Sequence, residues 1–313
     1  MLPHVLLLAT VALGIVPAAA ALASARWPYR SPAAAILLWQ ALGLSWGLAA
    51  VGTLAAVAAV HDRYGVAGGA LSGAADAVRA AALGFGVSSI FAVARLCFLA
   101  AALALLTLLC WVLVAASAAV LLARRKHRTL LSLLAHGDPK VPGALVVDHP
   151  AAAAYCVPGL RSRIVISAGT LDLLDPPELA AVLAHERAHL RARHDLVLLP
   201  FGALVRAFPR SRLVHKAHVT VALLVEMLAD DHALRHRPAR ELATALLRVG
   251  VSGAGHTPSG ALAAVTGADG DVATRVARLL APNPRLPLPA QALICAAAAL
   301  LVAVPVSLLL FTF

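Results

Sequence analysis

The stretch AVLAHERAHLRARHDL, residues 181–196, places two histidines four positions apart, with a glutamate directly after the first. Its other residues are mainly alanine, leucine and arginine, which favour a helix. On a helix, positions four apart lie on one face, so His185 and His189 can direct both imidazoles at one ion while Glu186 flanks it. This is the HExxH arrangement, in which two imidazoles hold zinc and the carboxylate takes a proton from water. The alternative for this stretch alone is a solvated histidine face on an amphipathic helix.

A third ligand for such an ion is available downstream. The segment LLVEMLADDHAL, residues 223–234, has a helical pattern with Glu226 and Asp230 four positions apart. A catalytic zinc ion takes three protein ligands, and Glu226 can complete the set. Asp230, one turn later, can accept the other N–H of a ligand histidine and so hold its ring in one orientation. The alternative for this acidic pair is an exposed helix end.

The residues before the HExxH motif predict a small sheet followed by the start of a helix. Three short runs typical of strands are separated by proline and glycine: ALVVD (144–148), AAYCV (153–157) and RIVIS (163–167). Asp175 is a candidate N-cap, Pro176 suits the first helical position, and Glu178 stands three residues after the cap, in the register of a capping box. The part of the chain that holds the motif is therefore expected to be an α+β domain.

The composition of the whole chain is that of a membrane protein. Of the 313 residues, 61% are apolar and only 13% are charged, and the mean hydropathy is +0.86, which is outside the range of soluble domains. Four stretches carry no Asp, Glu, Lys or Arg: 1–25, 31–60, 96–123 and 286–313. Each is longer than the roughly 20 residues that a helix needs to cross a bilayer. The first resembles a secretory signal near its alanines but lacks a basic start, so we expect it to be an uncleaved helix.

The basic residues near the ends of these stretches predict the orientation of the chain in the membrane. Arg26 and Arg30 lie between the first two stretches, and ARRKHR (123–128) follows the third. Because basic loops stay in the cytoplasm, the N-terminus and the loop at 61–95 are expected outside and the segment 124–285 inside. The expected domains are three transmembrane helices in 1–123, a cytoplasmic zinc domain in 124–285 and a last transmembrane helix in 286–313. Residues 196–225 hold two apolar runs too short to cross, which favour buried or interfacial helices, although a shallow re-entrant pair stays open.

The positive charge and the cysteines exclude other classes of protein. The formal charge of +11 follows from the basic loops, and no basic patch is interleaved with aromatic residues, so direct binding of nucleic acid is not expected. The four cysteines are isolated in the sequence. Neither a disulfide framework nor a thiolate zinc site is therefore indicated.

Taken together, these motifs resemble a known group of membrane enzymes. HERAHLRARHDL followed by EMLAD, preceded by GLRSRIVISAGTLDLL and set between apolar stretches, resembles the BlaR/MecR family of membrane zinc metallopeptidases. A more distant likeness is to the HtpX and CAAX prenyl protease group. The resemblance covers about 124–280 and the four apolar stretches. Sensor members of the BlaR/MecR family continue into an external penicillin-binding domain, whereas this chain stops at Phe313, so we do not expect β-lactam sensing.

The resemblance implies a zinc (Zn2+) endopeptidase of the gluzincin type. Its metal ligands would be His185, His189 and Glu226, and its general base would be Glu186. Asp230 would support a ligand histidine without binding the metal itself. The expected fold is a mainly α membrane protein of about four transmembrane helices, with a cytoplasmic α+β gluzincin-like domain between the third and the fourth.

Several functions are compatible with these features. The leading expectation is cleavage of a cytoplasmic or membrane-proximal protein, with a transcriptional repressor as the substrate implied by the resemblance. One alternative is an HtpX-like quality-control protease of membrane proteins, and another is a non-catalytic transducer with a structural zinc site. Glu186 favours an enzyme, because a structural site has no use for a carboxylate beside the open coordination position. The expected partners are the lipid bilayer and the protein substrate, and the sequence does not indicate the oligomeric state.

A candidate for substrate binding is the strand-like segment SRIVISAG, residues 162–169. An exposed sheet edge can hold a peptide in extended form by main-chain pairing. The segment alternates β-branched residues and lies a few residues before the motif helix, so we assign this role to its central residues: Arg163, Ile164, Val165, Ile166 and Ser167. An interior core strand is the alternative.

Other residues near the motifs are candidates for supporting roles at the site. The oxyanion that forms on an attacked carbonyl needs a donor, and the residues near Glu226 that can donate are His232, Arg235 and His236. Surface positions are the alternative for all three. His194 and Asp195 either brace the site or form a polar helix end.

Overall fold

A computed structural model of the chain describes residues 2–59, 90–139, 141–159, 162–252, 269–281 and 284–310. The contacts divide the chain into two compact units. The first contains residues 1–25, 34–112 and 287–313, and the second contains residues 26–33 and 113–286. Each unit is described by itself.

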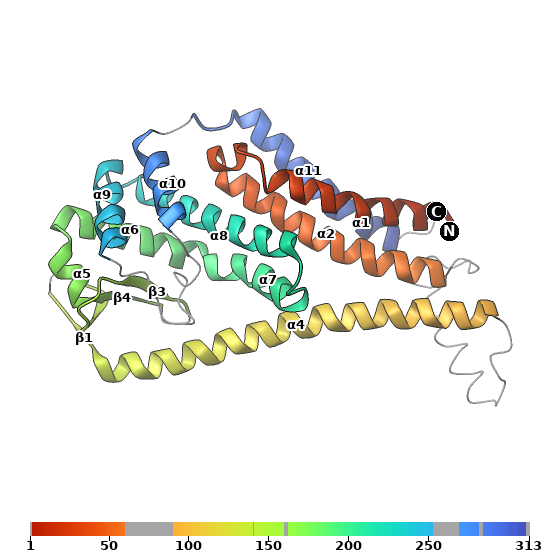
Figure 1. The fold of residues 1–313 in the computed structure, drawn as a ribbon, viewed down its shortest axis with the longest axis horizontal. Helices are drawn as coiled ribbons and strands as arrows, with labels where there is room; N and C mark the ends of the chain where they lie inside the picture. Colours follow the sequence, from red (N-terminus) through yellow and green to blue (C-terminus); the bar gives the residue numbers. More distant parts are fainter. Residues whose placement is uncertain are drawn as a thin grey trace. The chain divides into compact units, whose positions relative to one another are not determined.

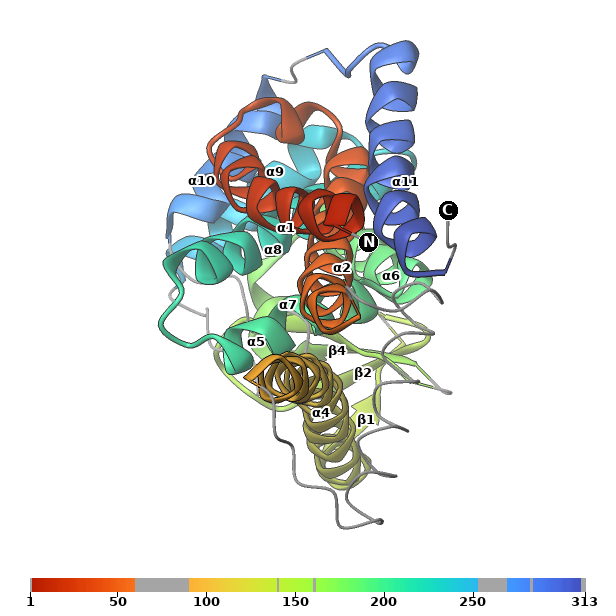
Figure 2. The ribbon, with the colours of Figure 1, turned by 90° about the vertical axis from the view of Figure 1, so that its right-hand side faces the viewer.

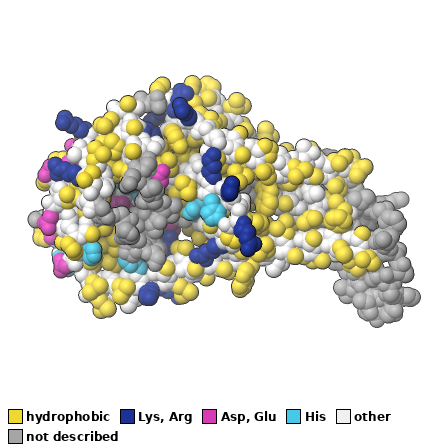
Figure 3. Space-filling view, in the orientation of Figure 1, with side chains coloured by type: hydrophobic (Ala, Val, Ile, Leu, Met, Phe, Trp, Pro, Cys, Tyr) yellow, Lys and Arg dark blue, Asp and Glu magenta, His cyan; other side chains and the backbone are white. Residues whose placement is uncertain are grey.

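The four apolar stretches form long helices, as predicted. They are α1 (Leu2–Leu22), α2 (Pro32–Ala58), α4 (Ile90–Leu134) and α11 (Leu288–Leu310), and each is long and apolar enough to cross a membrane. Large apolar side chains on them are exposed, Trp111 at 68% and Leu13 at 73% among them, and hydrophobic side chains spread over their visible surface in Figure 3. Such exposure is what lipid contact requires. The prediction of a mainly helical chain with several apolar helices and a small sheet is confirmed.

Helices α1, α2 and α11 pack together within the first unit. Leu8 of α1 is fully buried against small residues of α2, with Leu308 and Leu309 of α11 beside it. The Ser45 hydroxyl donates to the carbonyl of Leu301 at 2.6 Å, which satisfies a polar group within an apolar helix pair. A Cβ atom at Gly52 would lie 2.9 Å from the Leu309 side chain, so this glycine allows a close approach of the two helices.

Helix α4 is longer than the predicted third span. It runs for 45 residues to Leu134, whereas the expected boundary was residue 123. The reason is local, because no glycine or proline occurs from Ile90 until Gly137, and helix-forming residues continue through the basic segment. Most of the expected external loop at 61–95 lies outside the described residues, and α4 has already begun at Ile90.

The small sheet of the second unit contains the three predicted strands and a short additional one. The strands are β1 (Ala135–Gly137), β2 (Ala144–Val147), β3 (Ala154–Val157) and β4 (Arg163–Ser167). Their order is β1-β2-β4-β3, with β2 and β4 parallel and the other pairs antiparallel. Strands β1, β2 and β4 lie side by side in Figure 2.

Strand β4 is an interior strand, so the prediction that it forms a substrate-binding edge is wrong. It pairs with β2 on one side and β3 on the other, and Val165 has both Leu145 and Tyr155 as neighbours. Ile164 and Ile166 belong to one core cluster and Val165 to another. A short apolar run buried on both faces is typical of a central strand. Among the described strands, the outer ones, each paired on one side, are β1 and β3.

The helices of the second unit surround the HExxH helix. They are α5 (Ala168–Leu173), α6 (Pro176–Ala192), α7 (His194–Ala207), α8 (Arg212–Ala233), α9 (Ala239–Val251) and α10 (Asp269–Leu280), with a 3-10 turn η1 (Trp27–Arg30) from the α1–α2 connector. Helix α6 contacts β3 and β4 as well as α7, α8 and α9, and Figure 1 shows it between the sheet and α8. The buried helix at the centre of this unit is therefore the one that carries the motif.

Helix α6 begins and ends as its sequence indicates. The Glu178 carboxylate accepts from the backbone N–H of Asp175 at 3.0 Å, which is the predicted capping box. The helix ends at Arg193, whose φ of 50° is left-handed, and α7 begins at the next residue. This turn brings the first residues of α7 back beside the motif.

Candidate metal centre

Helices α6 and α8 bring together two imidazoles and one carboxylate. The Nε2 atoms of His185 and His189 are 3.0 Å apart. Glu226 of α8 places Oε2 at 3.3 Å from His185 Nε2 and Oε1 at 3.4 Å from His189 Nε2. All three side chains are buried, and their ligand atoms lie within 4.8 Å of one another. Residues from two helices thus converge on one point.

The donor set fits a zinc ion. Two imidazole nitrogens and one carboxylate oxygen are ligands that zinc prefers, and three protein ligands leave a fourth position open. Ligand atoms crowded this closely inside a protein repel one another unless a cation or protons lie between them. The geometry therefore favours a catalytic type of metal site, in agreement with the sequence.

Asp230 lies directly behind the first ligand. Its Oδ1 is 2.9 Å from His185 Nδ1, and the residue is fully buried. A carboxylate in this place leaves Nε2 of His185 free to face the ion and makes the imidazole a stronger ligand. The placement is the one that the spacing of Glu226 and Asp230 on the helix suggested.

Arg275 of α10 joins the two acidic residues and was not singled out in the sequence. Its Nε and a terminal nitrogen donate to both oxygens of Asp230 at 2.9 and 2.7 Å, and its other terminal nitrogen lies 3.0 Å from Glu226 Oε2. Arg275 is 4% exposed, so the bidentate pair is shielded from water. A sequence signal existed: Val272, Arg275, Val276 and Leu279 share one helical face, and an arginine within an apolar stripe needs a buried partner.

The electrostatics of the cluster keep its carboxylates ionised. Burial acts to raise the pKa of Asp230, but Arg275 and His185 outweigh burial and lower it to about 2. The pKa of Glu226 is likewise held well below its ordinary value, because His189 and Arg275 outweigh burial. Burial acts to lower the pKa of His185, yet Asp230 and Glu226 raise it to about 9. Ionised carboxylates facing two imidazoles make the pocket attractive to a divalent cation.

His194 supports the second ligand from the start of α7. Its Nδ1 is 2.9 Å from Nδ1 of His189, and it is 1% exposed. Burial lowers the pKa of His194 to about 3, so the ring is neutral and can accept a proton shared with His189. The neighbouring Asp195, itself buried, forms an ion pair with the partly exposed Arg124 at 3.0 Å. Of the two sequence interpretations, bracing of the site is the one that this geometry favours.

Glu186 lies beside the cluster and contacts the edge strand β3. The thiol of Cys156, which is fully buried, lies beside the Glu186 carboxylate. Burial raises the pKa of both groups, so the thiol stays protonated and can act as the donor. No sequence pattern connects Cys156 with the motif, because the contact depends on β3 packing against α6.

The residues proposed for substrate binding are distributed differently from the prediction. Ile164, Val165 and Ile166 are buried core residues. The Ser167 hydroxyl accepts from the N–H of Thr170 at the start of α5, and Arg163 is exposed at the beginning of β4. Because β4 is interior, the outer strand near the metal cluster in the described sheet is β3, which contacts α6.

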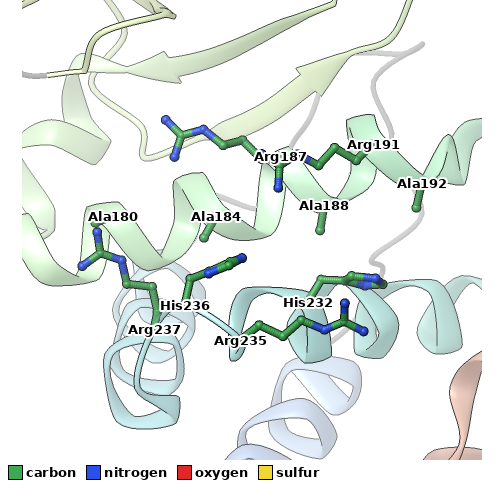
Figure 4. Close-up of a pocket in the computed structure, with 10 residues that line it drawn as sticks. All are labelled: Ala180, Ala184, Arg187, Ala188, Arg191, Ala192, His232, Arg235, His236 and Arg237. Carbon is green, nitrogen blue, oxygen red and sulfur yellow. The ribbon is translucent and has the colours of Figure 1, made fainter.

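The three oxyanion candidates share a cavity beside the motif helix. His232, Arg235 and His236 line a cavity between α6 and the end of α8 (Figure 4), and the described lining of that cavity includes none of the cluster residues. The reason is helical geometry, since His232 is six residues after Glu226 and is therefore rotated by about 240° around α8. Arg235 and His236 follow the end of α8 at Ala233. Among the described residues, no hydrogen bond or ion pair joins these three side chains to the metal ligands, so their role as oxyanion donors stays a prediction.

Comparisons with known proteins agree with the site. The model of peptidase family M48 matches residues 120–229, which include His185, Glu186, His189 and Glu226. A protein named protease HtpX homolog, from Thermoplasma acidophilum, is 43% identical over 58 residues, and the match covers 18% of this chain and 18% of that protein. No solved structure matches. The M48 model thus matches the segment that carries the metal cluster, in a chain that also has apolar helices long enough to cross a membrane.

Proposed function

We propose that the chain is a zinc-dependent membrane endopeptidase. Its zinc ligands are His185, His189 and Glu226, and its general base is Glu186. The observation that carries the proposal is the convergence of the three buried ligand atoms within 4.8 Å of one another, with Glu186 next to the first ligand in the chain. The non-catalytic alternative leaves this buried carboxylate without a role.

Each residue of the site has its own role in peptide hydrolysis. Zinc bound here supplies Lewis acidity, which lowers the pKa of water and polarises the carbonyl of the substrate. Glu186 accepts the proton of the attacking water and returns it to the leaving amine. Burial raises the pKa of its carboxyl group, which suits a base that must later act as an acid. Asp230, held by Arg275, keeps His185 in its ligating orientation.

The outer strand β3 is the better place for the substrate backbone. Strand β3 (Ala154–Val157) is an outer strand of the sheet and carries Cys156, whose thiol contacts Glu186. A peptide paired with this edge would be extended and would run past the general base. Main-chain pairing accepts many sequences, as a protease with protein substrates requires.

The substrate is proposed to be a protein in or near the cytoplasmic face of the membrane, where the spans tether the catalytic domain. The match to a protease HtpX homolog favours the quality-control alternative, in which damaged membrane proteins are cut. The BlaR/MecR resemblance and the domain between the third and fourth apolar helices favour cleavage of a transcriptional repressor. Both functions use the same active site.

The zinc chemistry is tested with two variants that separate ligand from base. We expect the purified chain in detergent to hold about one zinc ion per molecule, as a three-ligand site binds a single ion. Glu226→Ala should lose most of the zinc, and Glu186→Gln should keep it while proteolysis of a denatured protein substrate stops. Asp172→Asn, which changes an exposed carboxylate, serves as the control and should change neither. Equal loss of zinc in both variants, or activity in Glu186→Gln, would contradict the assignment.

The substrate is tested by comparing cells that express the wild type with cells that express Glu186→Gln. A cytoplasmic repressor that stays intact only with the inactive variant supports signalling. Accumulation of misfolded membrane proteins supports quality control. Quantitative proteomics of the membrane and cytoplasmic fractions distinguishes these outcomes.

A further inference from the structure

A cavity on the outer side of the motif helix is strongly basic. It measures about 480 Å³ and lies between α6 and the segment 232–237, where α8 ends (Figure 4). Its lining consists of alanines and of basic or titratable residues: Ala180, Ala184, Ala188, Ala192, Arg187, Arg191, His232, Arg235, His236 and Arg237. We call this set the basic cavity. Nothing in the proposed zinc chemistry uses it.

The positive charge of the basic cavity is not neutralised locally. No acidic residue occurs in its described lining, and in the part of the chain that the structure describes no ion pair joins a carboxylate to any of its four arginines. The acidic residue next to His232 in the chain is Asp231, and its carboxylate is already paired with Arg278 at 2.8 Å. Four guanidinium groups around one cavity therefore create a strong attraction for an anion.

The floor of the basic cavity is apolar and smooth. Its four alanines recur every fourth position of α6 and so follow one helical face, and Figure 4 shows their short side chains facing the end of α8. Methyl groups leave room for a ligand to lie along the helix between the guanidinium groups. The lining thus suits a ligand that joins an anionic group to an apolar part.

Helix α8, whose end lines the basic cavity, contacts the connector between two candidate membrane spans. The turn η1 lies between α1 and α2 and packs against α8. Arg278 donates to the carbonyl of Tyr29 in η1 at 2.8 Å while it pairs with Asp231. Arg30 of η1 donates to the carbonyl of Pro284, shortly before α11 begins at Leu288. A connector of a few residues between two spans lies at the membrane surface, so the end of α8 belongs to that region as well.

We propose that the basic cavity binds the headgroup of an anionic glycerophospholipid. The phosphate diester matches the guanidinium groups, which bind phosphate oxygens in pairs, and the glycerol and first acyl carbons match the alanine floor. Clusters of arginine at a membrane surface attract anionic lipids. A bound lipid would hold the outer face of α6, the helix that carries the HExxH motif, against the membrane surface.

The proposal is tested on the full-length chain with phosphatidylglycerol and phosphatidylcholine as probes. Native mass spectrometry of the detergent-solubilised protein measures how many molecules of each lipid stay bound during a titration. We expect tighter binding of phosphatidylglycerol to the wild type. The variant Arg187→Gln/Arg191→Gln should weaken it about fivefold per charge removed, the usual effect of a basic residue near an anionic surface. Inorganic phosphate at the same concentration should not displace the lipid.

A matched control removes the same charge elsewhere. Arg206→Gln/Arg210→Gln changes two exposed arginines that do not line the cavity, and it should keep the wild-type affinity. Equal losses in both double variants would mean that only the net charge matters, which overturns the proposal. Displacement of the lipid by phosphate, or preference for an acidic peptide over phosphatidylglycerol, overturns it as well.

A measurement on the unaltered protein covers the case in which a variant folds poorly. Hydrogen–deuterium exchange of the wild type is compared in nanodiscs of phosphatidylglycerol and of phosphatidylcholine. Slower exchange at 187–192 and 232–237 in the anionic nanodiscs supports the proposal, and equal exchange of these segments overturns it. The zinc content of the variants shows that any change in lipid binding is separate from the metal site.

Discussion

Two adjacent aspartates of α8 have different surroundings and therefore different roles. Asp230 is fully buried, lies 2.9 Å from His185 Nδ1 and holds Arg275 in a bidentate pair. Asp231 is partly exposed and pairs with Arg278 outside the metal cluster. In the sequence the two residues look alike, and only the rotation of about 100° between them on the helix separates them.

This difference makes a sharp prediction about zinc affinity. Asp230→Asn should weaken zinc binding by about 10- to 100-fold, the usual effect of removing a carboxylate that orients a ligand histidine. Asp231→Asn should leave the affinity unchanged, since its partner Arg278 contacts no ligand. Competition with a fluorescent chelator measures both. Indistinguishable affinities for the two variants would remove Asp230 from the site.

At the scale of the element, the residues of β4 could be predicted from the sequence, whereas its position in the sheet was predicted wrongly. Its range, Arg163–Ser167, agrees with the predicted run. Its place between β2 and β3 depends on pairing with two strands that both precede it in the chain. Periodicity reports which residues are extended and apolar, but not how many neighbours a strand has.

The interior position predicts the result of a proline substitution. Val165→Pro removes a backbone donor from a strand that is paired on both sides, so the domain should fail to fold and should hold no zinc. Val165→Ala keeps the N–H group and should lose only some apolar burial, with zinc retained. Circular dichroism measures whether each variant folds, and the zinc content measures whether its metal site forms. A folded, zinc-loaded proline variant would restore the edge interpretation.

At the scale of the whole molecule, the connectors of the apolar helices and the metal domain share contacts. The α1–α2 connector contributes η1 to the same unit as the metal cluster, through the contacts of Tyr29 and Arg30. The basic end of α4 reaches that unit through the Arg124–Asp195 pair. These contacts require the connector and the domain to be on one side of the membrane, and their arginines favour the cytoplasmic side.

The predicted topology can be tested with reporter fusions. A fusion after Arg128 should report the cytoplasm, and a fusion after Phe313 should report the outside, because four spans separate an external start from an external end. A cytoplasmic signal at Phe313 would contradict the arrangement. The segment to examine first would then be 196–225, where α7 and α8 are apolar but fall outside the four candidate spans.

The sequence by itself determined the local features of this protein. These features are the four apolar helices, the capping box at Asp175 and the shared face of His185 and His189. Each depends on residues within a few turns of one another, so helical periodicity is enough to predict it. The approach of Glu226 to the two histidines could be anticipated in part, because an acidic pair inside an apolar helix calls for buried partners.

Only the tertiary structure decided which distant residues meet. Arg275 reaches Glu226 and Asp230 from a separate helix, and Cys156 reaches Glu186 from the edge of the sheet. The same packing makes β4 an interior strand and turns the candidates His232, Arg235 and His236 toward the basic cavity. The physical reason is that such contacts depend on the order of strands and on how helices pack, and many chain paths are compatible with the same local pattern.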